Sequence, residues 1–139
     1  MSQSPNRRIR CLIAKVGLDG HQRGVQIIAR AWRDAGFEVI YLGLRNTPEE
    51  FARVAVDEGV DVAGISILSG SHIYLTRATR RAMDEAGAAD VSLIVGGIIP
   101  RVEVDDVIAA GAARVLGPGS TLEGAVAAVY EVSRDHERT

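Results

Sequence analysis

The sequence lacks most features that would mark a secreted, membrane-spanning or nucleic-acid-binding protein. Its single cysteine, Cys11, excludes an intramolecular disulfide framework and a multi-cysteine zinc site. No apolar run approaches the roughly 18 residues that a membrane span needs. The apolar stretch near the N-terminus breaks at Lys15, so we expect no secretion signal. The formal net charge is −2, without the basic excess of nucleic-acid binders. These absences predict a cytoplasmic globular protein.

Size and nucleotide-binding motifs exclude further classes. The length of 139 residues predicts a single domain, 1–139, with a core at about residues 9–133 and frayed tails. It is too short for a TIM barrel, which needs about 250 residues. Neither G-x-G-x-x-G nor G-x-x-x-x-G-K-[ST] follows a strand-like run, so the dinucleotide fingerprint and the P-loop are missing.

Short apolar runs alternate with amphipathic segments along the whole chain. The runs are rich in Val, Ile and Leu, which is typical of strands covered on both faces in a parallel sheet. Gly36, Gly87 and Gly111 follow three amphipathic segments as helix stops, and residues 47–50 (TPEE) form a helix start. Together they predict an α/β fold, a flavodoxin-like or Rossmann-like (βα)5 doubly wound parallel five-stranded sheet. The expected strands are 10–16, 37–42, 60–68, 91–95 and 113–116, and the expected helices are about 23–35, one starting at 47, 73–86, 102–110 and 121–134.

The loops at the carboxyl ends of the strands are the candidate site, because open parallel sheets bind ligands there. The first, residues 15–24, places His21 two residues after Asp19, and Lys15, the only lysine, is within reach of Asp19. A carboxylate on one imidazole nitrogen is typical of a metal-ligating histidine, although a lone loop histidine near an aspartate is more often solvated or capping. If His21 is a ligand, the metal must arrive already chelated, because one histidine cannot hold a bare transition metal.

The ends of the third, fourth and fifth strands carry glycine and serine in place of bulky side chains. Each loop alone is explained by turn formation. Together they predict a deep slot for a long, narrow ligand group. The residues concerned are Ser66, Ser69, Gly70, Ser71, Gly96, Gly97, Gly117, Gly119 and Ser120.

Three motifs, in order and spacing, resemble the signature of the cobalamin-binding (B12) domain: Asp19-x-His21-x-x-Gly24, Ser66-x-Leu68 and Gly96-Gly97. The segments KVGLDGHQRG, GLRNTPEE, ISILSGSH, VGGIIP and VLGPGS extend the resemblance to the cobalamin-binding module of the adenosylcobalamin-dependent acyl-CoA mutases. It covers roughly residues 9–133. The sequence departs at Gln22, where the mutases usually carry aspartate, which leaves open how this position contacts the corrin side chains.

The resemblance implies that the chelated metal is corrin cobalt and that His21 replaces the cofactor's own dimethylbenzimidazole as its lower ligand. The displaced nucleotide tail then enters the slot. Lys15, Asp19 and His21 are implied to act together as the catalytic group that holds and tunes the cobalt. The residues implied to bind the cofactor are Asp19, Gly20, His21, Gln22, Arg23, Gly24, Ser66, Leu68, Ser69, Gly70, Gly96, Gly97, Gly117, Pro118, Gly119 and Ser120.

The resemblance also implies a function, radical isomerisation of an acyl-CoA by adenosylcobalamin. In this family the substrate binds a separate TIM barrel, for which this chain has no room. The chain is therefore expected to be the small subunit of a two-subunit mutase with a large TIM-barrel partner. Which acyl-CoA is the substrate stays open.

Three alternatives compete with this prediction. Glutamate mutase has a small cobalamin subunit with the same signature, but residues 15–24 and 47–50 are more like those of the acyl-CoA group. A corrinoid methyl carrier usually has a helical cap domain before the first strand, where about nine residues stand here. A receiver domain needs an acidic cluster and a phosphorylatable aspartate at the ends of its first and third strands, whereas Ser66 and Leu68 occupy the third.

Structural roles are expected for the remaining conspicuous side chains. We expect Cys11 to be buried in the first strand. Trp32, Tyr74 and Met83 stand at helical spacing and are expected in the core or an interface. His72 is expected to cap its helix or face solvent.

Overall fold

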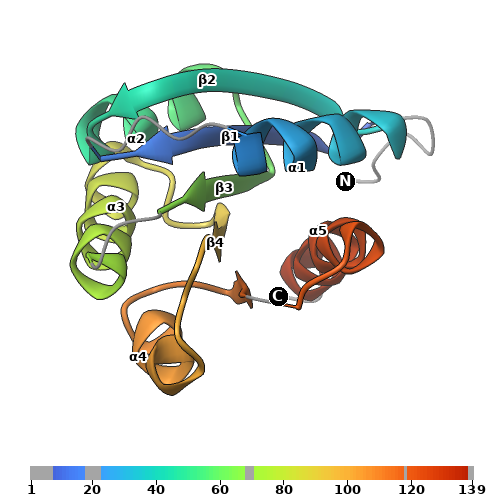
Figure 1. Ribbon diagram of the computed structural model, residues 1–139. Coiled ribbons are helices and arrows are strands. Elements are labelled where there is room, and N and C mark those ends of the chain that lie inside the picture. Colours follow the sequence, from blue (N-terminus) through green and yellow to red (C-terminus); the bar gives the residue numbers. More distant parts are fainter. Residues whose placement is uncertain (1–7, 18–22, 68–70, 118, 138–139) are drawn as a thin grey trace.

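Five parallel strands form one sheet in the computed structural model, with helices on both of its faces (Figure 1). The structure describes residues 8–17, 23–67, 71–117 and 119–137. The strand order β2-β1-β3-β4-β5 is a doubly wound order, which confirms the predicted fold class. The strands are β1 (Arg10–Val16), β2 (Glu38–Asn46), β3 (Val62–Ser66), β4 (Ser92–Gly96) and β5 (Arg114–Leu116). The helices are α1 (Arg23–Asp34), α2 (Pro48–Asp57), α3 (His72–Ala86), α4 (Val104–Ala109) and α5 (Leu122–Glu137), with a 3-10 turn, η1 (Arg101–Glu103), before α4.

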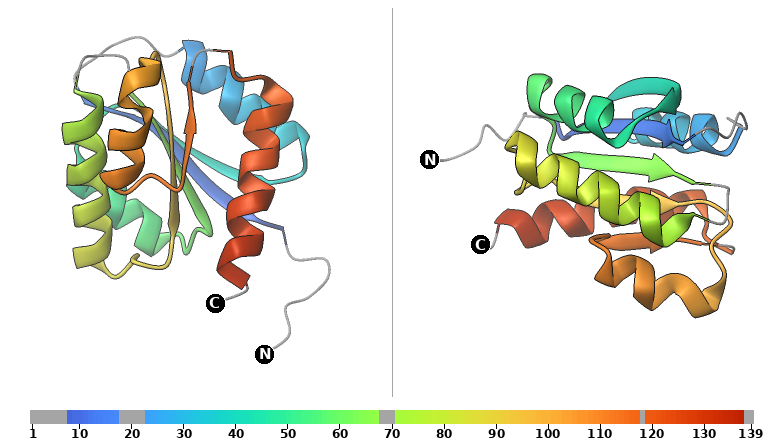
Figure 2. Two further views of the ribbon diagram at one scale, coloured as in Figure 1. Left: turned by 90° about the horizontal axis from the view of Figure 1, so that it is seen from below. Right: turned by 90° about the vertical axis from the view of Figure 1, so that its left-hand side faces the viewer.

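A hydrophobic core lies on each face of the sheet. Helices α1 and α5 cover one face, and α2, α3 and α4 cover the other (Figure 2). Side chains of β1 alternate between the two cores: Cys11 and Ile13 pack toward α1 and α5, whereas Leu12 and Ala14 pack on the opposite side. Because both faces are covered, the strands need apolar residues at nearly every position, which is the pattern seen in the sequence.

The helix signals in the sequence are confirmed. The Thr47 hydroxyl accepts a hydrogen bond from the Glu50 amide at 3.1 Å, and the Glu50 carboxylate accepts one from the Thr47 amide at 2.9 Å. The bond from the Thr47 backbone is the main reason that the pKa of Glu50 lies below its usual value. Gly36, Gly87 and Gly111 adopt φ angles of 98°, 102° and 130°, which suits glycine at these helix stops.

The second strand is longer than the sequence predicts. Residues 43–46, expected in a loop, continue β2 through two register shifts against β1. Gly43 adopts a φ of 92°, and the Asn46 side-chain amide donates to the carbonyls of Gly43 at 2.9 Å and Lys15 at 3.1 Å. Side-chain hydrogen bonds therefore hold an irregular stretch in the sheet. At the other end of the chain, residues 135–137, expected to be frayed, belong to α5.

Most of the conspicuous side chains lie where the sequence predicts. Cys11, Trp32 and Met83 are fully buried. Burial, with a smaller contribution from the charge of Asp61, raises the pKa of Cys11 to about 12, so its thiol stays protonated near neutral pH. None of the helices among the described residues is long and apolar enough to cross a membrane.

The prediction for His72 is wrong, and the prediction for Tyr74 is narrowed to an interface. Tyr74, expected in the core or an interface, is 70% exposed and is not part of the core, so its place in an interface stays a prediction. It lies about 200° around the helix from His72, away from the buried stripe that runs through Thr76 and Met83. His72, expected to cap the helix or face solvent, is only 3% exposed.

Candidate functional site

The predicted ligand-binding residues of the strands lie in one row along the carboxyl edge of the sheet. The strand register places Lys15 of β1 opposite Ser66 of β3, Ser66 opposite Gly96 of β4, and Gly96 opposite Leu116 of β5. The chain leaves β1 toward β2 on one side and returns to β3 on the other, so the strand order reverses here. Open α/β sheets bind their ligands at this point.

A cavity of about 420 Å³ opens beside this row, on the face covered by α1 and α5. Its volume falls within the range of small-molecule sites. Most of the described lining is apolar, and the polar side chains among it are the hydroxyls of Ser66, Ser120 and Thr121. The lining residues are Ile13, Gly24, Val25, Ile27, Ile28, Trp32, Gly64, Ile65, Ser66, Ile94, Gly96, Gly97, Ile98, Leu116, Gly117, Ser120, Thr121 and Ala125.

Trp32 joins the two helices that flank the cavity. Its indole ring is fully buried, and its Nε1 donates a hydrogen bond to the carbonyl of Ala125 in α5 at 3.1 Å. The ring lies directly on β3, because a Cβ at Gly64 would come within 2.7 Å of its Cη2 atom. A glycine in the middle of a strand therefore makes room for the tryptophan that ties α1 to α5.

The two glycines that end β4 have different structural reasons. Gly97 has a φ of 138°, and a Cβ there would lie 2.0 Å from the carbonyl oxygen of Ile67, so no side chain fits. The close approach accompanies a 2.9 Å hydrogen bond from the Ile67 amide to the Gly96 carbonyl. Position 96 shares its face with Ile94 by strand alternation, and a Cβ there would meet the nearest atoms of Leu116 at an ordinary 3.6 Å. Glycine at 96 thus leaves the cavity open.

The first turns of α1 and α5 border the cavity from either side. The chain turns after β5 with a 3.1 Å hydrogen bond from the Ser120 amide to the Gly117 carbonyl. The Thr121 hydroxyl then caps α5 by accepting from the Gly124 amide at 2.9 Å. Helix N-termini carry a partial positive charge, so this end of the cavity favours an anionic or hydrogen-bond-accepting group.

Lys15 is fully buried at the end of β1. Strand alternation places it on the same face of the sheet as Ile13, beside Ser66. A buried ammonium group is stable only with a charged or polar partner. Its predicted partner, Asp19, lies outside the described residues, so their pairing stays a prediction.

Six predicted cofactor-binding residues come together at the cavity, and all are small. Gly119 lies in the adjoining turn, where it adopts a φ of 89°, and Arg23 begins α1. The six are Gly24, Ser66, Gly96, Gly97, Gly117 and Ser120. The predictions for Asp19, Gly20, His21, Gln22, Leu68, Ser69, Gly70 and Pro118 lie outside the described residues.

Most of the helical side of the cavity was not predicted from the sequence. Ile28 and Thr121 line it, as does Trp32, which was expected only in the core or an interface. One signal could have found the contact between β3 and α1: an isolated glycine inside a strand pattern, here Gly64, indicates close backbone approach. Nothing in the sequence pairs that glycine with Trp32.

Comparison with known proteins identifies the class to which this fold and cavity belong. The sequence matches the B12 binding domain family over residues 9–127. The chain therefore belongs to the B12-binding domain family.

Its relatives define its place within that family. It is 52% identical to the 2-hydroxyisobutanoyl-CoA mutase small subunit of Aquincola tertiaricarbonis over 72% of this chain and 71% of the relative. It is 42% identical to the pivalyl-CoA mutase small subunit of Xanthobacter autotrophicus over 93% of this chain and 86% of the relative. It also matches 18% of the methylmalonyl-CoA mutase large subunit of Propionibacterium freudenreichii, at 43% identity. Within its family the chain is thus a cobalamin-binding small subunit of the acyl-CoA mutases, which are isomerases.

Solved structures show the same fold at low sequence identity. A cobalamin-binding protein from Desulfitobacterium hafniense superposes with a TM-score of 0.76 at 22% identity, over 92% of this chain and 59% of that one. A signal receiver domain from Mycobacterium tuberculosis superposes with a TM-score of 0.69 at 17% identity, over 91% and 97%. Because both classes share the fold, the fold alone does not separate them, and the family match does.

Replacing Gly97 by alanine should destabilise the protein strongly. The new Cβ would collide with the Ile67 carbonyl and strain a positive φ. Each effect costs roughly 1–3 kcal/mol, so we expect urea unfolding to show a loss of about 3 kcal/mol or more. The matched change Gly96→Ala should stay within about 1 kcal/mol of the wild type. Equal stabilities of the two variants would contradict this account of the β4 terminus.

Proposed function

We propose that the chain binds adenosylcobalamin with the nucleotide tail in the cavity and with His21 as the lower ligand of cobalt. The observation that carries the proposal is the cavity at the carboxyl edge of the sheet, kept open by glycine at the end of β4. An apolar wall suits the aromatic base of the tail. The hydroxyls and the two helix N-termini suit its sugar and phosphate.

The residues of this chain would do three kinds of work. Ser66 would hydrogen-bond the base of the tail at the sheet edge. Asp19 would accept a hydrogen bond from the second imidazole N–H of His21, which fixes the ring orientation and makes the imidazole a stronger ligand. Lys15 is buried, so solvent would not screen its positive charge. That charge would keep the Asp19 carboxylate ionised. The chemistry that adenosylcobalamin supplies when bound is homolysis of its cobalt–carbon bond, which starts radical isomerisation of the acyl-CoA.

The substrate would bind a large TIM-barrel partner subunit. The relatives support this division: two are named small subunits, and the methylmalonyl-CoA mutase large subunit contains the matched segment within a much longer chain. The small subunit would then present the cofactor, and the acyl group would be selected by the partner. We place the complex in the cytoplasm, in keeping with the single cysteine and the composition.

Removing the proposed cobalt ligand should weaken cofactor binding severely. We expect His21→Ala to lose more affinity for adenosylcobalamin than Asp19→Ala, whose loss should be about 10–100-fold, as for other residues that orient a metal ligand. Absorption titrations of the two variants and the wild type measure this. His136→Ala is the control, because residue 136 lies far along α5 from the cavity end, and it should bind like the wild type. Equal affinity in all four proteins would reject His21 as the ligand.

Filling the cavity from the sheet should also weaken binding. A leucine at position 96 would project into the space proposed for the tail, and we expect an affinity loss of about tenfold or more, since overpacking costs roughly 1–3 kcal/mol. Ala89→Leu, at an exposed position beyond the opposite end of β4, is the matched control and should change nothing. A Gly96→Leu variant that is folded by circular dichroism and binds like the wild type would place the tail elsewhere.

Catalysis should require both subunits. The chain with adenosylcobalamin and the large subunit of an acyl-CoA mutase is expected to isomerise that enzyme's acyl-CoA, and neither subunit should do so alone. Product analysis by mass spectrometry measures this. Turnover with the catalytic subunit of glutamate mutase instead, or methyl transfer from a corrinoid methyltransferase system, would favour one of the alternative functions.

A further inference from the structure

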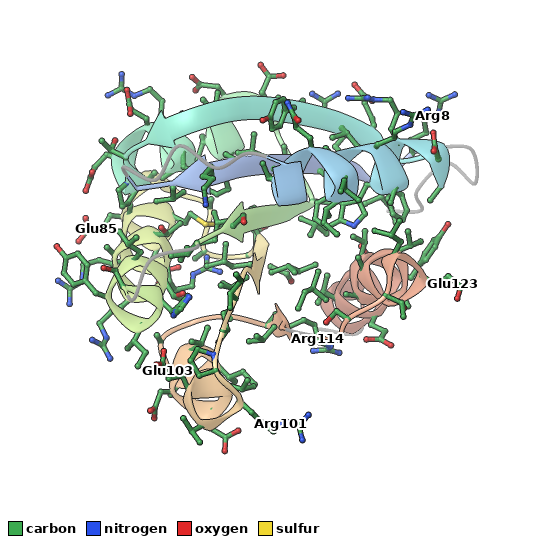
Figure 3. All side chains as sticks on the ribbon, viewed as in Figure 1. Arg8, Glu85, Arg101, Glu103, Arg114 and Glu123 are labelled. Carbon is green, nitrogen blue, oxygen red and sulfur yellow. The ribbon has the colours of Figure 1, made fainter. Side chains whose placement is uncertain are left out.

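A buried histidine at the start of α3 has no role in the site described so far. The His72 side chain is only 4% exposed, and its Nδ1 lies 3.3 Å from Oε1 of Glu103 at the end of η1. Figure 3 labels Glu103 where α4 approaches α3. An ionised carboxylate can only accept hydrogen bonds, so Nδ1 is the donor in this contact. The pair therefore links the first turn of α3 to the segment that follows β4.

The other ring nitrogen of His72 lowers the stability of the folded protein. Its Nε2 is buried and has no hydrogen-bond partner among the described residues. A buried polar atom without a partner costs roughly 1–3 kcal/mol, and an apolar side chain of similar volume would avoid that cost. Stability alone therefore does not explain why a histidine stands here. Buried polar atoms without a partner are found mainly at functional sites.

The first turn of α3 also supports the start of the loop that carries His21. A Cβ at Gly17 would lie 3.2 Å from Cδ1 of Leu75, one turn of α3 along from His72. Gly17 adopts a φ of 108°, and its amide donates to the carbonyl of Asn46 at 3.1 Å. Gly17 is the last described residue before that loop. A shift of the first turn of α3 would thus move the surface on which the loop begins.

From these contacts we infer that His72, held by Glu103, is a positioning residue for the cobalt-ligand loop. The hydrogen bond fixes the first turn of α3 against η1, and through Leu75 the fixed turn sets where the loop leaves β1. The inference rests on the proposed function, since it concerns the loop of the proposed ligand His21. Neither His72 nor Glu103 is among the residues that line the cavity.

A double-mutant cycle in the 139-residue chain tests this inference. We expect His72→Leu and Glu103→Ala each to weaken adenosylcobalamin binding about 2–30-fold. The double variant should lose no more than either single variant, because both changes remove one interaction. His72→Asn, whose amide nitrogen takes the place of Nδ1, should retain most of the affinity. Asp105→Ala, which removes an exposed carboxylate in the next turn, is the control and should bind like the wild type.

Two measurements separate positioning from a merely structural role. Thermal unfolding of His72→Leu should show a midpoint equal to or above that of the wild type, since the unpaired Nε2 is gone. Hydrogen exchange of the amides of residues 17–24 in the cofactor-free protein should nevertheless become faster in both single variants. If His72→Leu does not fold, Glu103→Ala alone carries the test, because that side chain is 33% exposed.

The outcomes distinguish this inference from the proposed function. Variants that bind and exchange like the wild type, while His21→Ala loses affinity, would overturn the inference and leave the proposed function standing. Losses that add in the double variant would also overturn it. A wild-type chain that does not depend on His21 for binding would overturn both.

Discussion

The close approach of β3 and β4 at their carboxyl ends is the constraint on which the site depends. A Cβ on residue 97 would lie only 2.0 Å from the carbonyl oxygen of Ile67. Only glycine therefore fits at this position. The neighbouring Gly96 could carry a methyl group without collision, yet it carries none and faces the cavity. Gly97 is thus required by the fold, whereas Gly96 leaves the cavity open.

The same face of the sheet depends on a second glycine contact. Gly64 lets the Trp32 ring lie directly on β3, and the indole then hydrogen-bonds α5. A hydrogen bond from Trp32 of α1 to Ala125 in the first turn of α5 therefore joins the two helices that flank the cavity, and both helices contribute residues to its lining. The opposite face has a different task. There α3 contacts the start of the first loop and, through His72 and Glu103, the segment after β4. The cavity thus lies on one face of the sheet, and the contacts of α3 lie on the opposite face.

The sequence predicts the fold well because its signals are local. Most of the five apolar runs show little polar alternation, which is typical of strands covered on both faces. Thr47 with Glu50, or a glycine such as Gly87, marks a helix end through its own hydrogen bonds or φ angle. The extension of β2 was missed because it depends on Asn46 bonding across to Lys15, a contact between strands. Small residues at three strand ends predicted a slot, and the cavity lies there.

Features that depend on neighbours distant in the sequence could not be predicted in this way. A histidine that begins a helix usually has access to solvent, and the burial of His72 follows from the packing of η1 thirty residues later. The pairing of Gly64 with Trp32 has the same character, because periodicity assigns each to an element but does not bring the two together. The Lys15, Asp19 and His21 arrangement came from family resemblance, and its acidic and imidazole members lie outside the described residues.

The identity of the nitrogen on the cobalt tests the central claim most directly. Electron paramagnetic resonance of the Co(II) cobalamin bound to the wild-type chain should show coupling to one axial nitrogen. That coupling should change when the protein is labelled with ¹⁵N-histidine, and the change should be absent in labelled His21→Ala. Coupling that stays the same on histidine labelling would show that dimethylbenzimidazole remains on the metal, and it would contradict both the ligand and the use of the cavity proposed for the tail.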